Sequence, residues 1–253
     1  MGKLIVVTSG KGGVGKTTLT ANLAACLAGR GRRVLAVDGD SYLKNLDIVF
    51  GMADSHIWDS GDVFAGRCAL DDAVIHVDGK ERLYLLPAPL RPPEEPERFT
   101  SFLLDTVKNI LASGEYDYII IDCPSGIGRG IDDFFIKNAY VIIVATPDVT
   151  SIHDASAIAD RAYAGKAEVS LAVNRIRVKS IENGRAPNID EMIDRVGVKL
   201  IGLIPEDPKT PEALNSGQLI TDTKRARSKR AYANIAARAD GEFTELYRFW
   251  KKN

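Results

Sequence analysis

Four glycines and two lysines lie within one nine-residue segment near the N-terminus, Gly10-Lys11-Gly12-Gly13-Val14-Gly15-Lys16-Thr17-Thr18. The segment follows an apolar run and matches the pattern G-x-x-x-x-G-K-[ST], which binds nucleotide phosphates where it joins a strand to a helix. Glycines allow successive backbone N–H groups to turn inward as a cradle for an anion, and the helix that follows adds its positive end. The segment from Lys11 to Thr18 is therefore predicted to bind phosphate.

Side chains of this segment have chemistry of their own. Lys16 is expected to reach the β and γ phosphates, and the Thr17 hydroxyl is expected to ligate Mg²⁺. Lys11 is not needed for a single phosphate cradle. Its spacing alone leaves two roles open, a solvated loop lysine and a second functional cation.

Carboxylates end two of the apolar runs. Asp38 and Asp40 follow the run at 33–37, and Asp122 follows the run at 118–121. A carboxylate buried at such a place is expected beside a cation. Asp122 is therefore predicted to hold Mg²⁺ or its bound water, with a helix N-cap as the alternative role. Asp38 is expected to lie behind the residues that touch the metal.

Strands and helices that could position these residues alternate along the chain. The apolar runs predict strands at 3–8, 33–37, 82–86, 116–122, 140–145, 168–174 and 199–204. Helical patterns lie at 17–29, 99–112, 131–137, 151–164, 189–196 and from about 229 onward. Continuously apolar strands between helices predict a doubly wound, mostly parallel α/β sheet covered on both faces. Such sheets bind ligands beyond the carboxyl ends of their strands, where the residues above are found.

Composition places limits on the class of protein. The chain has 253 residues, 26% of them charged, and a net charge of −1. We expect one domain over residues 1–253, and no overall charge that attracts nucleic acid or membrane. The apolar runs are far shorter than the roughly 18 residues of a membrane span. The three cysteines form no C-x-x-C, and no signal-peptide pattern precedes the first strand, so a cytoplasmic protein is expected.

With Lys11 at its start, the glycine segment resembles that of the deviant Walker-A P-loop ATPases, the superfamily of MinD, ParA, the nitrogenase iron protein and the arsenite pump. The resemblance covers nearly the whole chain. It implies ATP as the nucleotide, and a homodimer in which Lys11 of each subunit reaches the partner's nucleotide. It further implies slow hydrolysis by Lys11, Lys16 and Asp40, with Asp40 orienting the attacking water or accepting its proton.

The segment Asp40-Ser41-Tyr42-Leu43-Lys44-Asn45-Leu46-Asp47 is more similar to switch I of MinD than to that of ParA, which usually has Pro-Gln after the second aspartate. The resemblance places Asp38 and Asn45 in this switch. Tyr42 departs from it, because many MinD proteins have a small residue there. Cys123 to Gly128 resembles switch II, where small residues permit movement when the γ phosphate leaves.

Later segments resemble further parts of the MinD pattern. In the segment Thr146 to Asp154 the last aspartate is implied to support dimerisation, with a helix cap or a surface acid as the alternative. The segment after the strand at 168–174 and the one after 199–204 resemble purine-binding elements, and the alternative is two ordinary turns. Their implied binding residues are Asn174, Pro205, Glu206 and Asp207. The Asn174 amide offers a donor and an acceptor to adenine.

The C-terminal residues carry an apolar stripe and positive charge. Phe243, Leu246, Tyr247 and Trp250 have the spacing of one helical face, which predicts a short amphipathic tail over 241–253. The tail suits contact with an anionic membrane surface, but packing of a closing helix on the domain explains the same pattern. The basic cluster at 224–230 is predicted to be a solvated helix start, with acidic lipid or DNA as alternative partners.

Together these patterns predict an ATP-driven switch, similar to MinD, that positions a membrane- or partner-associated system such as the cell division site. Its cofactors would be ATP or ADP with Mg²⁺, and a protein activator or cargo would complete it. It would be cytoplasmic and could bind peripherally to the inner face of the cell membrane. Two alternatives are a DNA-partitioning ATPase similar to ParA and a scaffold that senses ATP without hydrolysing it.

Overall fold

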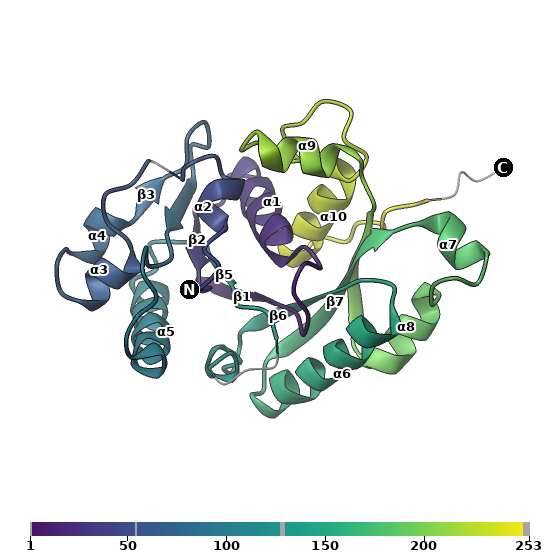
Figure 1. The fold of residues 1–253 in the computed structure, drawn as a ribbon, viewed down its shortest axis with the longest axis horizontal. Coiled ribbons are helices and arrows are strands. Elements are labelled where there is room, and N and C mark those ends of the chain that lie inside the picture. The colour runs from purple at the N-terminus through teal and green to yellow at the C-terminus, as the bar shows by residue number, and fades with distance from the viewer. Residues whose placement is uncertain (1, 54, 127–129, 250–253) are drawn as a thin grey trace.

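The computed structural model of the chain describes residues 2–53, 55–126 and 130–249. Eight strands form one sheet in the order β3-β4-β2-β5-β1-β6-β7-β8 (Figure 1). Their bounds are Lys3–Thr8 for β1, Val34–Asp38 for β2, Ile75–His76 for β3, Leu83–Leu86 for β4, Tyr118–Asp122 for β5, Tyr140–Ala145 for β6, Glu168–Ile176 for β7 and Lys199–Pro205 for β8. Only the short pair β3 and β4, among the pairs of the described residues, is antiparallel. The predicted doubly wound α/β fold is confirmed.

Helices cover both faces of this sheet. They are Lys16–Gly29 for α1, Leu46–Val49 for α2, Ser60–Phe64 for α3, Leu70–Ala73 for α4, Pro96–Ser113 for α5, Val149–Ala164 for α6, Val178–Glu182 for α7, Ile189–Val196 for α8, Lys209–Asn215 for α9 and Lys229–Ala239 for α10. A 3₁₀ turn at Asp132–Phe134 stands where a helix over 131–137 is predicted. None of the helices in the described ranges combines the length and apolar character needed to cross a membrane.

Two apolar cores hold the layers together, because successive strand side chains point to opposite faces. In β1, Leu4 and Val6 pack with α5, α6 and α8, whereas Ile5 and Val7 pack with α1 and α10. Figure 1 shows these two sets of helices on opposite sides of the sheet. Each fully buried aliphatic side chain contributes about 1.5–3 kcal/mol relative to exposure, which is why the strands are apolar on both faces.

Strand register brings the polar strand ends to one edge. Val7 of β1 pairs with Asp122 of β5, and Asp38 of β2 pairs with the same aspartate. The loop that follows β1 therefore begins beside both carboxylates. Parallel pairing thus gathers residues that lie more than a hundred positions apart in the chain at the carboxyl edge of the sheet.

The helix predicted over 131–137 is wrong after Phe134. Phe135 has ψ 52, which is outside the helical region, and Asn138 has φ 70. Both phenylalanines are only 2% exposed. The end of α6 packs on this turn so closely that a Cβ on Gly165 would lie 1.9 Å from the carbonyl oxygen of Phe135. Tertiary packing therefore outweighs local helical propensity here.

The C-terminal segment also differs from the prediction. α10 ends at Ala239, Gly241 has φ 90, and residues 242–249 have no helical structure. The predicted helical face is therefore wrong over its described members, Phe243, Leu246 and Tyr247. Trp250 lies outside the described residues.

Side chains of α10 hold this segment away from a helical path. The Arg238 guanidinium donates to the Thr244 carbonyl over 2.8 Å, and the Asn234 amide donates to the Glu245 carbonyl over 2.9 Å. Leu246 and Tyr247 are half-buried against the apolar cores, whereas Phe243 is 97% exposed. Part of the described tail thus packs on the domain, in an irregular conformation.

Candidate nucleotide-binding site

The glycine segment forms a loop between β1 and α1, as the sequence predicts. Gly13 and Gly15 have φ 76 and φ 100, a backbone region that side chains other than glycine rarely adopt. A Cβ on Gly15 would lie 2.3 Å from the Asn174 Nδ2, and one on Gly10 would lie 2.3 Å from the Asp154 Cβ. Both the turn and the close approach of neighbouring residues therefore require glycine.

Lys16 and Thr17 begin α1 beside the aspartate that ends β5. Lys16 is 8% exposed and Asp122 is 2% exposed. The Thr20 hydroxyl donates to the Asp122 carboxylate over 3.0 Å, and the Thr17 hydroxyl also hydrogen-bonds it. Sequence reasoning missed Thr20. Its signal was the helical spacing, because residues three and four positions apart share one face of a helix.

Burial governs the charge of the two strand-end aspartates. It raises the pKa of Asp122 to about 6, although Thr17, Lys16 and Thr20 oppose the rise. Burial and the neighbouring Asp122 raise the pKa of Asp38 well above its usual range. Two buried carboxylates side by side favour a cation, because a cation stabilises their ionised forms.

The donor set at this edge fits Mg²⁺. The Thr17 hydroxyl and the Asp122 carboxylate are hard oxygen ligands, which Mg²⁺ takes in ones and twos together with phosphate oxygens and water. Within residues 2–53, 55–126 and 130–249, no group of three or more His, Cys, Asp or Glu side chains could hold a metal alone. Thr17 and Asp122 are the residues that would hold Mg²⁺ at this edge.

Replacing Asp122 with asparagine should stabilise the nucleotide-free protein and weaken binding of Mg-nucleotide. The folded-state pKa of about 6 lies above the ordinary aspartate pKa of 3.8, so the folded protein holds this proton more tightly and stability falls as pH rises between those values. At pH 7 the asparagine variant should exceed the wild type by about 1–3 kcal/mol in free energy of unfolding. Urea titrations at pH 5 and pH 7 measure this difference.

Asp71→Asn, at an exposed position of α4, is the matched control and should change stability little at either pH. A difference between Asp122→Asn and wild type that is equal at the two pH values, or a loss of stability at pH 7, would contradict the assignment of a costly buried charge.

Asp38 organises the segment predicted as switch I. Its carboxylate accepts backbone N–H bonds from Asp40, Asn45 and Leu46 at 3.1–3.2 Å. The Asp40 carboxylate in turn accepts the N–H groups of Tyr42 and Leu43 at 3.1 and 2.9 Å. The loop is thus folded around two aspartates. A change in the charge near Asp38 would alter the backbone hydrogen bonds that hold residues 40–46.

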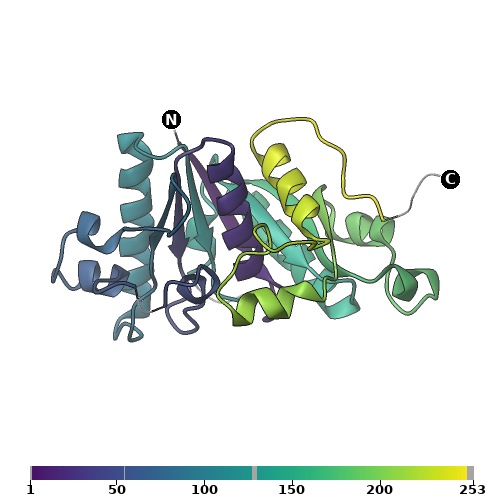
Figure 2. The same cartoon turned by 90° about the horizontal axis from the view of Figure 1, so that it is seen from above.

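One cavity of about 400 Å³ lies against the glycine loop. We call it the phosphate cavity; its lining includes Gly12, Gly13, Gly15, Lys16, Thr17, Thr18, Asp40, Asn45, Ser125 and Arg175. α9 closes it through Leu214 and Asn215, and Figure 2 shows this helix beside the start of α1. Asp40 therefore lies close to the expected phosphates. Part of the predicted switch II, Ile127 and Gly128, lies outside the described residues.

A second cavity of about 400 Å³ continues from the first. This base cavity is lined by the predicted purine-binding residues Asn174, Pro205, Glu206 and Asp207, together with Thr18, Tyr232 and others. The structure thus brings both predicted segments together beside the glycine loop. Its volume is of the size usual for a small-molecule site, about 300–1,000 Å³.

Hydrogen bonds fix the lining of the base cavity. The Asn174 Nδ2 donates to the Val14 carbonyl over 2.7 Å, and its Oδ1 accepts the Arg175 N–H over 2.8 Å. The Asp207 carboxylate accepts the Ser228 N–H and hydroxyl at 2.8 and 2.9 Å. Asn174 therefore braces the glycine loop as well as facing the cavity, and Asp207 anchors the start of α10.

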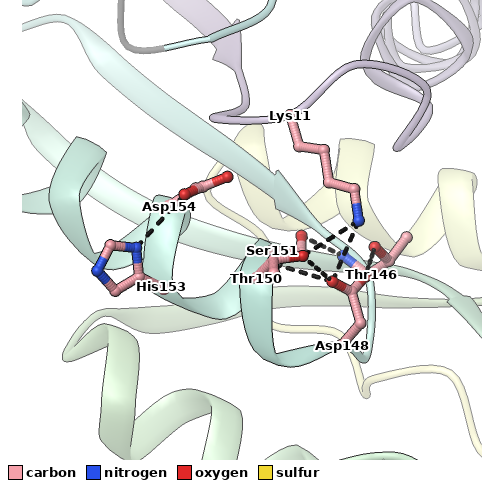
Figure 3. A network of polar contacts seen from close by, with 7 residues as sticks. All are labelled: Lys11, Thr146, Asp148, Thr150, Ser151, His153 and Asp154. Atoms are coloured by element: carbon pink, nitrogen blue, oxygen red, sulfur yellow. Dashed lines mark hydrogen bonds and ion pairs between the residues drawn. The ribbon is translucent and has the colours of Figure 1, made fainter.

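Lys11 is held by residues at the start of α6. Its Nζ lies 3.2 Å from the Asp148 Oδ1 and 3.3 Å from the Thr150 Oγ1 (Figure 3). Partial burial tends to raise the pKa of Asp148, but the hydrogen bonds that it accepts from Thr146, Ser151, Thr150 and Lys11 outweigh this effect and lower the pKa to about 2. This contact spans more than a hundred residues, and the sequence contained no sign of it.

Asp154 lies on the first turns of α6 but apart from the Lys11 contact (Figure 3). Its Cβ packs against Gly10, and its carboxylate lies 3.4 Å from the His153 ring. A place beside the glycine loop is compatible with its expected role in dimerisation.

Five exposed cations form the basic cluster, Lys224, Arg225, Arg227, Lys229 and Arg230. In the part of the chain that the structure describes, none of them forms an ion pair. Ser228, between them, is 1% exposed and bonded to Asp207. The cluster therefore adjoins the base cavity through this serine.

Known proteins with similar sequences share this nucleotide-binding pattern. Residues 5–220 match the family model described as the CobQ/CobB/MinD/ParA nucleotide binding domain. The chain is 38% identical to the septum site-determining protein MinD of Bacillus subtilis, covering 97% of this chain and 92% of that protein. It is 36% identical to the MinD protein of Synechocystis, covering 96% and 91% of the two chains.

Solved structures show similar agreement. A chain of the MinC:MinD cell division protein complex of Aquifex aeolicus superposes with a TM-score of 0.87 at 35% identity, covering 97% of this chain and 98% of that one. MinD of Pyrococcus horikoshii, complexed with Mg-ADP, gives 0.82 at 30% identity, with 95% and 96% covered. A ParA family ATPase of Chlorobium tepidum gives 0.73 at 24% identity, with 93% and 97% covered, and shares the fold.

Proposed function

Because the chain belongs to the CobQ/CobB/MinD/ParA family of nucleotide-binding proteins, we propose that it is an ATP-driven switch, similar to MinD, that positions a cell-division or similar partner-associated system. The observation that carries the proposal is the phosphate cavity, in which the glycine loop, Lys16 and the buried Asp122 converge beside a base cavity. The Mg-ADP of the Pyrococcus relative supports a nucleotide with Mg²⁺ as the ligand.

The residues of the phosphate cavity suit binding and hydrolysis of ATP. Thr17 and Asp122 would hold Mg²⁺, which neutralises charge on the β and γ phosphates when bound. Lys16 adds a cation against the same phosphates. Asp40 has one carboxylate oxygen engaged by backbone N–H groups, so its other oxygen is the one to orient the attacking water and accept its proton.

Dimerisation would move Lys11 from its own chain to the partner's nucleotide. The Lys11 and Asp148 side chains are 46% and 40% exposed, and exposed ion pairs contribute only about 0–1 kcal/mol. A charge-assisted bond to phosphate is roughly twice as strong as a neutral one. Exchange of Asp148 for a phosphate of the partner's ATP is therefore favourable, and Asp154 beside Gly10 would support the same interface.

Nucleotide state would be coupled to partner binding through mass action. A nucleotide that binds the closed dimer better than the monomer shifts the equilibrium toward the dimer. Exposed apolar side chains of the Asp38-anchored loop, Tyr42 at 65% and Leu43 at 64%, would be covered in that dimer or by a partner. Slow hydrolysis removes the γ phosphate and restores the monomer.

Release of phosphate from MgATP tests the activity itself. We propose slow turnover, accelerated by a protein activator. Binding of ATP without any release of phosphate, over many hours, would support the alternative of a scaffold that senses ATP without hydrolysing it.

DNA binding is the second candidate function, favoured by the five exposed cations of the basic cluster at 224–230. Full engagement of these five side chains would give a slope of about −4.5 for the logarithm of affinity against the logarithm of salt concentration. Gel shifts with non-specific duplex DNA and ATP at several salt concentrations measure this slope.

A membrane-associated switch should instead float with anionic vesicles in the presence of ATP. Phe243, which is 97% exposed, would contact the lipid.

A further inference from the structure

Arg175 lies where the two halves of the proposed nucleotide site meet. It is the penultimate residue of β7 and is exposed. Its side chain lines the phosphate cavity, the base cavity and a third cavity that contains Lys11 and Asp148. Because phosphates are expected in the first and the base in the second, Arg175 lies where the phosphate chain of a bound nucleotide would continue into the sugar.

Among the residues that the structure describes, the Arg175 guanidinium forms no hydrogen bond and no ion pair. Arg177, two positions further on, pairs with Glu206, and Arg175 acts on that carboxylate only through its charge, which lowers the pKa of Glu206. A planar guanidinium offers a fork of N–H donors that matches phosphate oxygens. An anionic ligand in the cavities would therefore meet an arginine that gives up no hydrogen bond or ion pair with the described residues to bind it.

The backbone at Arg175 is held in an unfavourable conformation. Its φ of 55 places it among four non-glycine residues with positive φ in the described ranges, with Asn138, Lys166 and Arg225. A left-handed backbone costs roughly 1–2 kcal/mol for an ordinary residue. Such a cost persists where the surroundings enforce it, and it clusters at functional sites.

Asn174 of β7 connects Arg175 to the glycine loop. Its amide donates to the Val14 carbonyl and accepts the Arg175 N–H, so one side chain ties the loop to the strained residue. A Cβ on Gly15 would collide with the same amide. The position of Arg175 is thus set by the loop that is expected to hold the phosphates.

We propose that Arg175 is a nucleotide-binding residue whose guanidinium contacts the phosphate chain at its ribose end, and that Asn174 is its positioning residue. The inference rests on the proposed function, because it needs a nucleotide in the two cavities. Lys16 lies on the side of the terminal phosphates, so the two cations neutralise different parts of the same chain.

Calorimetric titration with MgADP tests the proposal through Arg175→Gly. Glycine adopts positive φ without strain, so this variant removes the side chain and keeps the backbone. Affinity for MgADP should fall about 10- to 100-fold, as for loss of a charge-assisted contact. Thermal unfolding without nucleotide should be close to that of the wild type, and Arg175→Lys should recover part of the affinity.

Lys166→Gly is the matched control. Lys166 is also an exposed cation with positive φ, and it precedes β7 at the opposite end of the strand. MgADP affinity of this variant should equal that of the wild type. Wild-type affinity in a folded Arg175→Gly would overturn the inference while the proposed function stands. Absence of MgADP binding by the wild type would overturn both.

Discussion

Replacing Lys16 with alanine is expected to raise the Kd for MgATP by about 10²- to 10⁴-fold, since two charge-assisted phosphate contacts of roughly 1.5–3 kcal/mol each are lost. Lys16 is 8% exposed, so water replaces its side chain poorly. Its loss also leaves the buried carboxylate of Asp122 without the cation that lowers its pKa. Calorimetric titration of the purified variant with MgATP measures the change.

Lys108→Ala is the control for this variant, because Lys108 is an exposed lysine of α5 that pairs with Asp105. It should bind MgATP as the wild type does. A Lys16→Ala protein with native circular dichroism could instead have a Kd for MgATP within about threefold of the wild-type value, which is no wider than the usual context dependence of such contacts. In that case the glycine loop would not be the phosphate site.

Replacing Lys11 with alanine should leave MgATP binding nearly intact and abolish the ATP-dependent dimer. Within its own chain Lys11 contacts Asp148 and Thr150. Its removal therefore leaves Lys16 and the rest of the phosphate cavity in place. A symmetric dimer would lose the Lys11 contact twice, which should raise the dimer dissociation constant by about 10²- to 10⁴-fold. Light scattering with a non-hydrolysable ATP analogue measures dimerisation, and calorimetry measures binding.

Arg98→Ala serves as the control here, since Arg98 is an exposed cation on α5 paired with Glu95. It should dimerise with the analogue. A Lys11→Ala protein that dimerises to the same extent would remove the cross-subunit role from the proposal and leave a P-loop protein with an ordinary loop lysine.

Strands and the glycine loop could be predicted because their signals are local and strong. A run such as Tyr118 to Ile121 is apolar on both faces, which a buried parallel strand requires, and the loop carries glycines at the positions of positive φ, Gly13 and Gly15. The parallel order then places Asp38 and Asp122 together. Short helices such as α2 and α7 were not predicted, because five residues or fewer show no helical period.

Contacts between distant segments could not be predicted in the same way. The ion pair of Lys11 with Asp148 depends on how α6 packs beside the loop, and the left-handed backbone of Arg175 has no signature in an arginine. At the C-terminus the apolar residues have helical spacing, but the chain turns at Gly241 and Arg238 hydrogen-bonds the segment that follows, which therefore forms no helix. An eight-residue pattern is too short to outweigh such tertiary contacts.

Sedimentation of the wild-type protein with each nucleotide tests the central claim most directly. The chain has a mass of 27.5 kDa. With Mg²⁺ and a non-hydrolysable ATP analogue the account predicts twice this mass, and with Mg²⁺ and ADP it predicts the monomer. The same mass with both nucleotides, whether monomer or dimer, would contradict a switch governed by ATP.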